Sequence, residues 1–373
     1  MVIIIFDVMN KEAQLELENV LDQYDIGSLL DFLEDQRGFV NTSFTITALR
    51  ESQTKKYFLR RYKKGVHEED IRQEHSIICH LVSNDFNLVA NVLSTKSGST
   101  YLQWRIDSED IFYAVFEFLK GEDRYTWVDP NCTKAEVASS ASVLARFHLA
   151  VGDFLPAGNR VEPKILEMRS IIIQNAEQCS RTKRGNDFDC YWKDHSTLVF
   201  KEIERVYQLL DKPAYSHLIQ LVNHCDYHPG NLKFDGEDVV GLFDFDWSKR
   251  DVRIFDVALA LFYFFTDWQG ELDGALRLDE VGRFLNTYQQ TLKDCQTPPP
   301  LSGIECQFMP AMIAASNLYI LNWTLIEYLK KDIDPQQYFV FLKHSVRMIS
   351  WLNLKSNWSS LAALIEKVCS PNW

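Results

Sequence analysis

A chain of 373 residues exceeds the usual length of a single domain, which favours two packed lobes over one core. Its 46% hydrophobic and 24% charged residues lie near the globular average and exclude the disordered, collagen-like and coiled-coil classes. The 52 acidic and 39 basic side chains give a net charge of −13, which argues against nucleic acid or anionic lipid as a partner.

The cysteines and the hydrophobic runs indicate where the protein works. Eight cysteines are scattered along the chain without a C-x-x-C pair, and a chain of this size needs no disulfides, so we expect reduced thiols in the cytoplasm. Residues 1–6 are apolar but lack a basic flank and end at Asp7, so no signal peptide is expected. The other hydrophobic runs, such as 257–265, are shorter than the ~20 residues of a membrane span, and we expect no membrane association.

Strand patterns dominate the first 118 residues. Phe44, Ile46 and Ala48 alternate with Thr45, Thr47 and Leu49, which predicts a half-buried strand. A second strand follows at 57–62 after a short polar loop, which predicts an antiparallel pair. Residues 68–83 have helical periodicity and place Glu74 on the apolar face, where a buried carboxylate requires a partner. Further strands are expected at 101–106 and 111–118.

The pattern changes from strand to helix near Gly121, and we place the lobe boundary between residues 118 and 119. The helices expected beyond it cover 135–150, 161–179, 191–210, 256–265, 280–294 and most of 310–368. The predicted fold class is therefore α+β, with a small antiparallel β-sheet lobe (1–118) and a larger, mainly helical lobe (119–373).

Residues 221–247 interrupt the helical lobe with polar side chains set between apolar runs. Asp226 and Asn231 lie five residues apart across a Pro229–Gly230 turn. Taken singly, either residue is more typical of a turn than of a catalytic site. The combination H-x-D-x-x-x-x-N is rarer and favours a functional segment, in which we interpret His224 as a structural residue that braces the loop.

Two more carboxylates follow a chain reversal at Gly236. The hairpin expected there returns Asp244 and Asp246 to the neighbourhood of Asp226 and Asn231. Oxygen ligands of this kind, without sulfur or paired imidazole, suit Mg²⁺, which prefers phosphate as a further ligand. The alternative for Asp244 and Asp246 is an exposed strand with one aromatic residue turned inward.

The run from His224 to Asn231, followed by Asp244-Phe245-Asp246, resembles the catalytic signature of the aminoglycoside-phosphotransferase superfamily. This superfamily includes choline kinases, methylthioribose kinase and type II homoserine kinases, and homoserine-kinase-like and N-acetylhexosamine-kinase-like members look most similar. Matching residues also appear upstream in the family's order, so the resemblance covers most of the chain: Gly38 to Thr42, Tyr57 to Arg60, Glu74, Glu117 to Leu119 and Leu144 to His148. The resemblance implies a bilobal, protein-kinase-like fold and transfer of the γ-phosphoryl group of ATP to a hydroxyl, with Mg²⁺.

The resemblance also implies a role for each matched residue. Asp226 would accept the proton of the acceptor hydroxyl and aim its oxygen at the γ-phosphorus, because phosphoryl transfer depends mainly on positioning. Asn231 and Asp244 would bind Mg²⁺, and Asp246 would either bind a second metal ion or support Asp244. Nucleotide contacts are expected from a phosphate turn (Gly38, Asn41, Thr42 and Ser43), from Arg60 with Glu74, and from an adenine hinge (Glu117 and Leu119).

Arg60 departs from the family's pattern, since a lysine usually occupies this strand position. Its guanidinium keeps the charge and offers a fork for phosphate or carboxylate, so an Arg60–Glu74 ion pair is expected. The departure also leaves open a regulatory pseudokinase that binds nucleotide without turnover. Because Asp226, Asn231 and Asp244 are all present, the sequence favours catalysis.

The acceptor is expected to be a small molecule, such as an amino acid or a sugar. Between Asp244 and the helix expected at Asp256 there is no room for an activation segment, which argues against a protein kinase. Asp256 itself is expected at the N-cap of that helix. Aromatic residues of the helical lobe keep a choline- or ethanolamine-type kinase as an alternative, because they can form a cage for a quaternary ammonium: Trp247, Tyr263, Trp268, Trp323 and Trp351. We expect a monomer or a homodimer.

Overall fold

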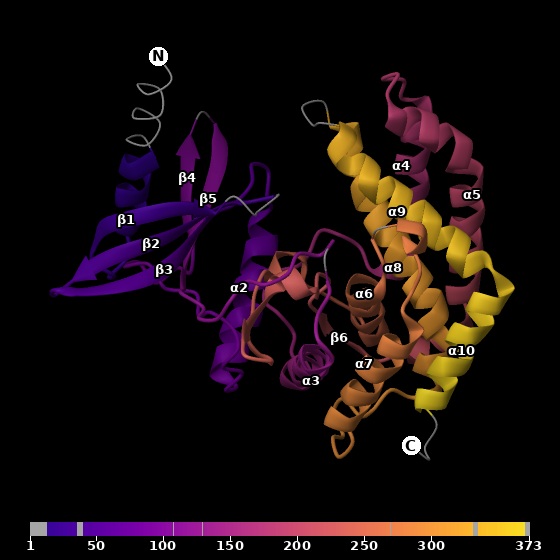
Figure 1. Cartoon of the computed structure of the whole chain (residues 1–373). Helices are drawn as coiled ribbons and strands as arrows, with labels where there is room; N and C mark the ends of the chain where they lie inside the picture. The colour runs from indigo at the N-terminus through magenta and orange to yellow at the C-terminus, as the bar shows by residue number, and fades with distance from the viewer. Residues whose placement is uncertain are drawn as a thin grey trace. The chain divides into compact units, whose positions relative to one another are not determined.

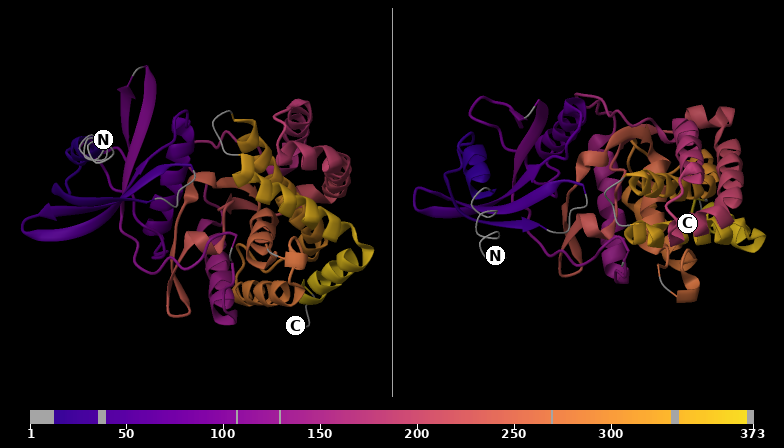
Figure 2. Two further views of the ribbon diagram at one scale, coloured as in Figure 1. Left: turned by 45° about the horizontal axis from the view of Figure 1, so that its top comes forward. Right: turned by 90° about the horizontal axis from the view of Figure 1, so that it is seen from above.

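The computed structural model describes residues 13–35, 40–106, 108–128, 130–268, 270–330 and 335–369. The chain divides into two compact units. Unit 1 comprises Met1–Gly121, Pro156–Val161 and Gly241–Asp246, and unit 2 comprises Glu122–Leu155, Glu162–Val240 and Trp247–Trp373. Figure 1 labels the elements of both units, and Figure 2 shows them from two further directions.

Unit 1 is built on a five-stranded antiparallel sheet with the strand order β1-β2-β3-β5-β4 (Figure 1). The strands are β1 (Ser28–Asp35), β2 (Thr42–Arg50), β3 (Gln53–Arg61), β4 (Leu102–Ile106) and β5 (Glu109–Glu117). The predicted antiparallel pair is confirmed as β2 and β3. Phe44, Ile46 and Ala48 of β2 are buried, as the alternation predicted, because successive side chains of a strand point to opposite faces.

The described part of unit 1 also contains two helical segments, residues 13–21 and helix α2 (Glu68–Ser83). The core of the unit draws on the 13–21 helix and on β2, β3 and β5, with these members among others: Leu17, Val20, Leu21, Phe44, Ile46, Leu59, Tyr113 and Val115. The sequence predicted α2 but neither the 13–21 helix nor β1. A register shift between Leu29 and Asp31 breaks the alternation of β1, so its pattern does not have the period of a regular strand.

Unit 2 is mainly helical, and together with the antiparallel sheet of unit 1 this confirms the predicted α+β class. Its helices are α3 (Lys134–Val151), α4 (Arg169–Arg181), α5 (Asp187–Leu210), α6 (Arg253–Phe265), α7 (Leu278–Thr291), α8 (Gly303–Leu329), α9 (Pro335–Asn353) and α10 (Lys355–Cys369). Helix α8 packs against α4, α5, α6, α9 and α10 (Figure 1). It is long and apolar enough to cross a membrane, but 89% of its apolar window is buried inside the protein, as in a central core helix.

The helix predicted over residues 161–179 begins later than expected. Helix α4 starts at Arg169, and the residues before it form a short 3₁₀ turn, Ile165–Met168. Pro163 precedes this turn, and the backbone N–H of Ile165 donates to Asp251 Oδ2 at 2.6 Å. This hydrogen bond to the Asp251 carboxylate replaces a helical hydrogen bond, so the helix does not extend back to residue 161.

The start of α6 also differs from the prediction. The helix begins at Arg253 with Val252 as its N-cap residue, so Asp256 lies inside the first turn and is not the N-cap. The strand before α6 runs directly into the helix, because the backbone N–H of Arg253 donates to Ile219 O at 2.7 Å. Asp256 is fully buried, which gives its carboxylate a different use, described below.

Four short strands lie between α5 and α6 in the sequence, and the polar segment of residues 221–247 falls within this region. They are β6 (Gln220–Asn223), β7 (Leu232–Asp235), β8 (Asp238–Leu242) and β9 (Lys249–Val252). Strand β6 pairs with β9 and β7 pairs with β8. The predicted reversal at Gly236 is confirmed: this residue joins β7 to β8 with a φ of +58°, which favours glycine.

One pair of cysteines contradicts the expectation of reduced thiols. Cys306 in α8 and Cys369 in α10 form a disulfide across a sequence separation of 63 residues. The other cysteines form no disulfide within the described residues. Spacing in the sequence does not reveal such a pair, because a disulfide requires only that two Cβ atoms come close, and here the packing of α10 on α8 brings them together.

Candidate active site

Asp226 follows β6 in unit 2, and three side chains surround its carboxylate. Asn231 Nδ2 donates to Asp226 Oδ2 at 2.8 Å, Tyr263 OH donates to Oδ1 at 2.9 Å, and His228 Nε2 lies 3.4 Å from Oδ2. Burial raises the pKa of Asp226, but attraction to His228 and the hydrogen bonds from His228 and Tyr263 outweigh burial, so the pKa lies below the usual aspartate value. Asp226 is therefore a carboxylate at neutral pH.

The backbone just before Asp226 is fixed by Asp256, in the first turn of α6. Asp256 Oδ2 accepts a hydrogen bond from His224 N at 2.7 Å, and Oδ1 accepts one from Cys225 N at 2.9 Å. Cys225 has a φ of +63°, a left-handed conformation that is costly for a residue with a side chain. His148 Nε2 lies 3.0 Å from Asp256 Oδ2. The buried carboxylate thus holds the strained turn that presents Asp226.

The turn after Asp226 depends on a glycine. A Cβ on Gly230 would lie 2.9 Å from His228 Cε1, closer than side-chain atoms normally approach. The backbone N–H of Gly230 donates to His228 Nδ1 at 3.0 Å, and this bond orients the imidazole whose Nε2 faces Asp226. His224 is buried and its Nδ1 accepts from Asp226 N at 3.3 Å, which confirms its interpretation as a structural residue that braces the loop.

In unit 1, Arg60 on β3 binds two carboxylates at once. Its Nη1 donates to Glu74 Oε1 and its Nη2 donates to Asp244 Oδ1, both at 2.8 Å. The predicted Arg60–Glu74 pair is confirmed, whereas the contact with Asp244 was not predicted. Burial disfavours the charged guanidinium, but Asp244 and Glu74 outweigh it and raise the pKa of Arg60 above its usual range. Tyr62 OH donates to Glu74 Oε2 at 2.7 Å, so both oxygens of the buried Glu74 are bonded.

Asp246 is tied to two other segments of unit 1. Asn41 Nδ2 donates to Asp246 Oδ2 at 2.9 Å, and Arg160 Nη1 donates to the backbone oxygen of Asp246 at 2.5 Å. Asp246 Oδ1 is buried and has no hydrogen-bond partner within the part of the chain that the structure describes. A buried carboxylate oxygen without a partner fits a cation ligand, because leaving it unpaired costs free energy.

The phosphate turn is only partly visible. Gly38 lies outside the described residues. Thr42 and Ser43 begin β2, where Ser43 pairs with Arg60 across the sheet. Asn41 precedes the strand, and besides its bond to Asp246 its Oδ1 accepts from the backbone N–H of Lys63 at 3.0 Å. The side chain of Asn41 is therefore a structural link within unit 1.

The hinge residues lie at the end of β5. The backbone N–H of Glu117 donates to Asn91 O at 2.8 Å, so this donor is already used within the fold. The carboxylate of Glu117 contacts Lys55 Nζ at 3.1 Å. Leu119 follows the strand and is half-buried. The backbone N–H of Glu117 is therefore already used and is not available for the adenine contact that the sequence predicts.

The predicted residues thus fall into two groups. Asp226 and Asn231 contact each other in unit 2, and the contacts in unit 1 join these residues: Asn41, Arg60, Glu74, Asp244 and Asp246. Over the described ranges, no three His, Cys, Asp or Glu side chains gather to form a metal site. Mg²⁺ does not require such a group, because it commonly binds one or two carboxylates together with substrate phosphates.

Sequence reasoning missed the partners that hold the two carboxylate groups in place. Tyr263 and Asp256 act on the Asp226 loop from α6, and Arg160 reaches Asp246 from a separate segment of unit 1. Of these residues, only Tyr263 could have been recognised in the sequence, because its hydroxyl is the polar group in an otherwise apolar stretch of helix. The other contacts span more than thirty residues of sequence and have no local pattern.

An aromatic cluster adjoins Tyr263 in unit 2. The ring centroid of Trp127 lies 5.9 Å from Tyr263, 5.4 Å from Trp268, 5.7 Å from Trp323 and 4.5 Å from Phe341. Three of the five predicted cage residues therefore meet around Trp127, a residue that the sequence did not indicate. We call these five residues the Trp127 cluster.

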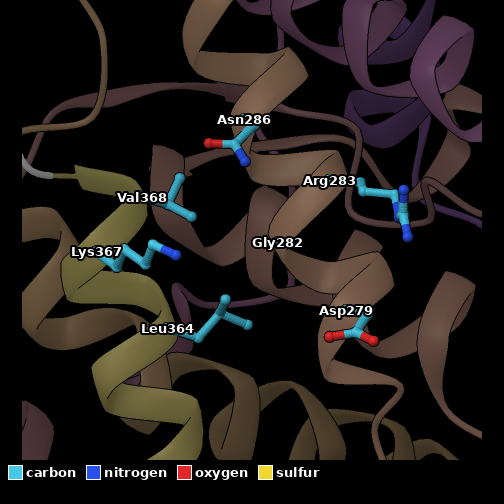
Figure 3. A pocket seen from close by; sticks show the side chains of 7 residues that line it. All are labelled: Asp279, Gly282, Arg283, Asn286, Leu364, Lys367 and Val368. Atoms are coloured by element: carbon cyan, nitrogen blue, oxygen red, sulfur yellow. The ribbon is translucent and has the colours of Figure 1, made fainter. Parts of the chain in front are cut away.

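A pocket of about 330 Å³ lies between α7 and α10 of unit 2 (Figure 3). Its lining residues are Asp279, Gly282, Arg283, Asn286, Leu364, Lys367 and Val368. None of the predicted site residues lines it, so this pocket is not part of the candidate active site.

Comparison with known proteins gives the family. Residues 35–292, more than half of the chain, match the family described as phosphotransferase enzyme family. The chain belongs to this phosphotransferase family. The phosphotransferase is 26% identical over 330 residues to a homoserine kinase of Bradyrhizobium sp. (strain ORS 278), a match that covers 87% of this chain and 90% of the relative. A homoserine kinase of Bradyrhizobium sp. (strain BTAi1) is 27% identical over 339 residues, covering 87% and 89%.

Solved structures of small-molecule kinases share the fold of this phosphotransferase. A microcompartment-associated aminopropanol kinase superposes with a TM-score of 0.68 at 13% identity, covering 92% of this chain and 98% of the other. A choline kinase from Cryptosporidium parvum gives a TM-score of 0.59 at 15% identity, covering 90% and 93%. The predicted protein-kinase-like fold is confirmed by these neighbours.

Proposed function

We propose that this phosphotransferase is an ATP-dependent small-molecule kinase whose acceptor is a hydroxyl of an amino acid such as homoserine, or of a sugar or amino sugar. The observation that carries the proposal is Asp226, an ionised carboxylate with both oxygens held by neighbouring side chains. The homoserine kinase relatives support an amino-acid acceptor. Residues 1–118 would form the nucleotide-binding lobe and 119–373 the catalytic lobe of a cytoplasmic enzyme.

Asn231, Asp244 and Asp246 are the residues proposed to bind Mg²⁺. The buried Oδ1 of Asp246, which has no hydrogen-bond partner among the described residues, supports this assignment, because a cation satisfies such an oxygen. The bound ion would supply positive charge that neutralises the phosphates of ATP.

The nucleotide contacts in the proposal come from unit 1. Arg60, held in place by Glu74, would direct its charge at the phosphates, and its raised pKa keeps that charge at all physiological pH values. The backbone at Thr42 and Ser43 would contribute N–H groups, and the backbone near Leu119 would contact adenine.

Asp226 would act on the acceptor. The acceptor hydroxyl donates a hydrogen bond to the carboxylate, which aims the hydroxyl oxygen at the γ-phosphorus. As the new O–P bond forms, the bond between the γ-phosphorus and ADP breaks and the hydroxyl proton passes to Asp226. A carboxylate of low pKa is adequate for this step, because positioning contributes more than proton removal in a loose transition state.

A choline- or ethanolamine-type kinase is the second candidate. The Trp127 cluster favours it, because aromatic rings near the base attract an ammonium group through cation–π interaction. The rings of the cluster contact one another directly, as they also do in an ordinary hydrophobic core. Homoserine and choline therefore belong in the same assay.

The proposal is tested by measuring ADP release and phosphorylated product with homoserine, hydroxylysine, choline and N-acetylhexosamines as acceptors. Asp226→Asn is expected to lower kcat roughly 10²- to 10⁴-fold, because it removes the base. Its Kd for ATP is expected to stay within about twofold of the wild-type value, since the base does not bind nucleotide.

The control for this variant is Asp235→Asn, which makes the same change at an exposed carboxylate in β7. Asp235→Asn is expected to leave kcat unchanged. Tight ATP binding without transfer to any acceptor would favour the regulatory pseudokinase instead, and equal losses in kcat and ATP affinity in Asp226→Asn would count against Asp226 as the base.

A further inference from the structure

Tyr263 carries the one polar side chain in the apolar run of residues 257–265. Its side chain is only 4% exposed, and its hydroxyl donates to Asp226 Oδ1 at 2.9 Å. Burial, and after it the charge of Asp226, raises the pKa of Tyr263 well above its usual value. The hydroxyl therefore stays protonated and remains a donor to the carboxylate.

Packing alone does not explain a tyrosine at this position. The neighbouring Phe262, Phe264 and Phe265 are fully buried in the same helix. A phenylalanine at 263 would fill nearly the same volume without burying a polar atom, which costs free energy unless the atom is hydrogen-bonded. The hydroxyl of Tyr263 is thus best explained by its bond to Asp226.

The partners of Asp226 divide between its two oxygens. Asn231 donates to Oδ2, and His228 also approaches Oδ2. Tyr263 donates to Oδ1, on the other side of the carboxylate. Holding both oxygens fixes the rotation of the carboxylate plane about the Cβ–Cγ bond, whereas holding one oxygen leaves this rotation partly free.

We propose that Tyr263 is a positioning residue that fixes the Asp226 carboxylate so that it selects the acceptor hydroxyl over water. The inference rests on the proposed kinase function. An acceptor molecule held by its own contacts cannot follow a rotated carboxylate, whereas a water molecule can. Loss of the Tyr263 bond therefore favours hydrolysis, in which water replaces the acceptor as the group that bonds to phosphorus and releases ADP.

The test is Tyr263→Phe, assayed with ATP and the acceptor that the wild type phosphorylates fastest, starting with L-homoserine. Phosphorylated acceptor and ADP are both measured, and rates are expressed per titrated ATP-binding site so that misfolded protein does not count. We expect transfer to fall roughly 10- to 100-fold, with ATP affinity within about twofold of wild type. The ratio of phosphorylated acceptor to ADP is expected to fall clearly below the wild-type ratio.

The matched control is Tyr319→Phe in the same unit. Tyr319 is 5% exposed and its hydroxyl donates to Glu162 Oε2 at 2.8 Å, so the change again removes a buried tyrosine–carboxylate bond. This control is expected to keep the wild-type ratio. Tyr263→Met, which also lacks the hydroxyl, is expected to lower the ratio if Tyr263→Phe does not fold.

Two results would overturn the inference in distinguishable ways. If the wild type transfers phosphate but the variants lose transfer and hydrolysis in parallel, with an unchanged ratio, Tyr263 has only a structural role and the proposed function still stands. If the wild type binds ATP and phosphorylates no acceptor, the proposed function fails, and the inference fails with it.

Discussion

Arg60 shows how one residue can serve two carboxylates that are far apart in sequence. Its Nη1 donates to Glu74 on α2, and its Nη2 donates to Asp244, which follows β8. Lysine carries a single ammonium and cannot form this fork with the same geometry. Arg60, at a position where the resemblance led us to expect lysine, therefore has a structural reason in unit 1, besides any contact with phosphate.

Arg60→Lys is expected to lose one of the two carboxylate bonds while keeping the positive charge. We expect the free energy of unfolding to fall by about 2 kcal/mol, because one charge-assisted hydrogen bond to Glu74 or Asp244 is lost. Urea unfolding followed by tryptophan fluorescence measures this change. The control is Arg61→Lys on the same strand, whose partner Glu16 lies at a partly exposed site. Equal stability of the two variants would contradict the importance of the fork.

His75 on α2 predicts a specific dependence of stability on pH. Burial, and then the charge of Arg60, lowers the pKa of His75 to about 3. The unfolded chain binds this proton at about pH 6.5, so below that value each pH unit is expected to cost the native state about 1.4 kcal/mol. Stability from this group is complete above pH ~6.5 and declines as the pH falls toward the folded pKa.

His75→Asn is therefore expected to lose less stability than the wild type between about pH 6.5 and about pH 4.5. Urea unfolding at several pH values measures the two curves, and comparing them cancels the other titrating groups. His80→Asn, a change at a half-buried site on the same helix, is the control for the substitution itself. Parallel curves for His75→Asn and the wild type would contradict the prediction.

At the level of elements, the beginning of α6 supports the loop that follows β6 and presents Asp226. The two oxygens of Asp256 accept one backbone N–H each, from His224 and Cys225. Helix α6 starts at Arg253, before the predicted start at Asp256, so Asp256 lies inside its first turn and is buried in unit 2. From there its carboxylate can accept from the backbone N–H of Cys225, the residue with the left-handed conformation. A helix and a loop that are separate in sequence thus form one rigid support for Asp226.

Asp256→Asn is expected to weaken this support, because an amide offers one acceptor oxygen where two backbone donors need partners. We expect the free energy of unfolding to fall by about 2 kcal/mol, the usual cost of one unsatisfied buried donor. A drop in kcat should accompany it, since the turn that presents Asp226 loosens. Asp238→Asn at an exposed site on β8 is the control. An unchanged kcat in Asp256→Asn would show that the turn holds without this bond.

The elements that were predicted correctly are those with a strong local pattern. Residues 68–83 form α2 as expected, and Glu74 on its apolar face does have the buried partner that the sequence required. The 13–21 helix and β1 were missed, and β1 carries a register shift that removes its period. Element boundaries near 161–169 were wrong because contacts from distant residues set them.

At the level of the whole molecule, the chain returns to unit 1 twice after its first long segment. Pro156–Val161 and Gly241–Asp246 both belong to unit 1, although they lie far beyond the lobe boundary placed between residues 118 and 119. These returns bring Arg160 and Asp246 into contact with each other and with Asn41 and Gln73. The change of pattern near Gly121 coincides with the end of the first long segment of unit 1, and it gives no sign of the two later returns.

The Cys306–Cys369 disulfide is the covalent link of unit 2. It joins the start of α8 to the end of α10 and closes a loop with a sequence separation of 63 residues. Cys369→Ser is expected to lower the free energy of unfolding of the oxidised protein by about 4 kcal/mol, because the unfolded chain gains entropy.

A measurement with reductant separates the loss of the disulfide from any change in packing that the Cys369→Ser substitution itself causes. With dithiothreitol present, Cys369→Ser and the wild type are expected to unfold at closely similar urea concentrations, because neither then carries the link. The exposed, free Cys190 provides the control Cys190→Ser, which is expected to behave as the wild type under both conditions. Equal stability of oxidised wild type and Cys369→Ser would show that the bond contributes nothing.

The amino-acid sequence by itself determined the α+β class, the β2–β3 pair, α2 and the segment of residues 221–247 that carries Asp226 and Asn231. These features follow from local periodicity and from residues only a few positions apart, which the chain displays directly. Only the tertiary structure decided that Tyr263 and Asp256 hold the Asp226 loop and that Arg60 reaches Asp244. Those contacts join residues 31 to 184 positions apart, and their distances depend on how helices and strands pack, which no local pattern records.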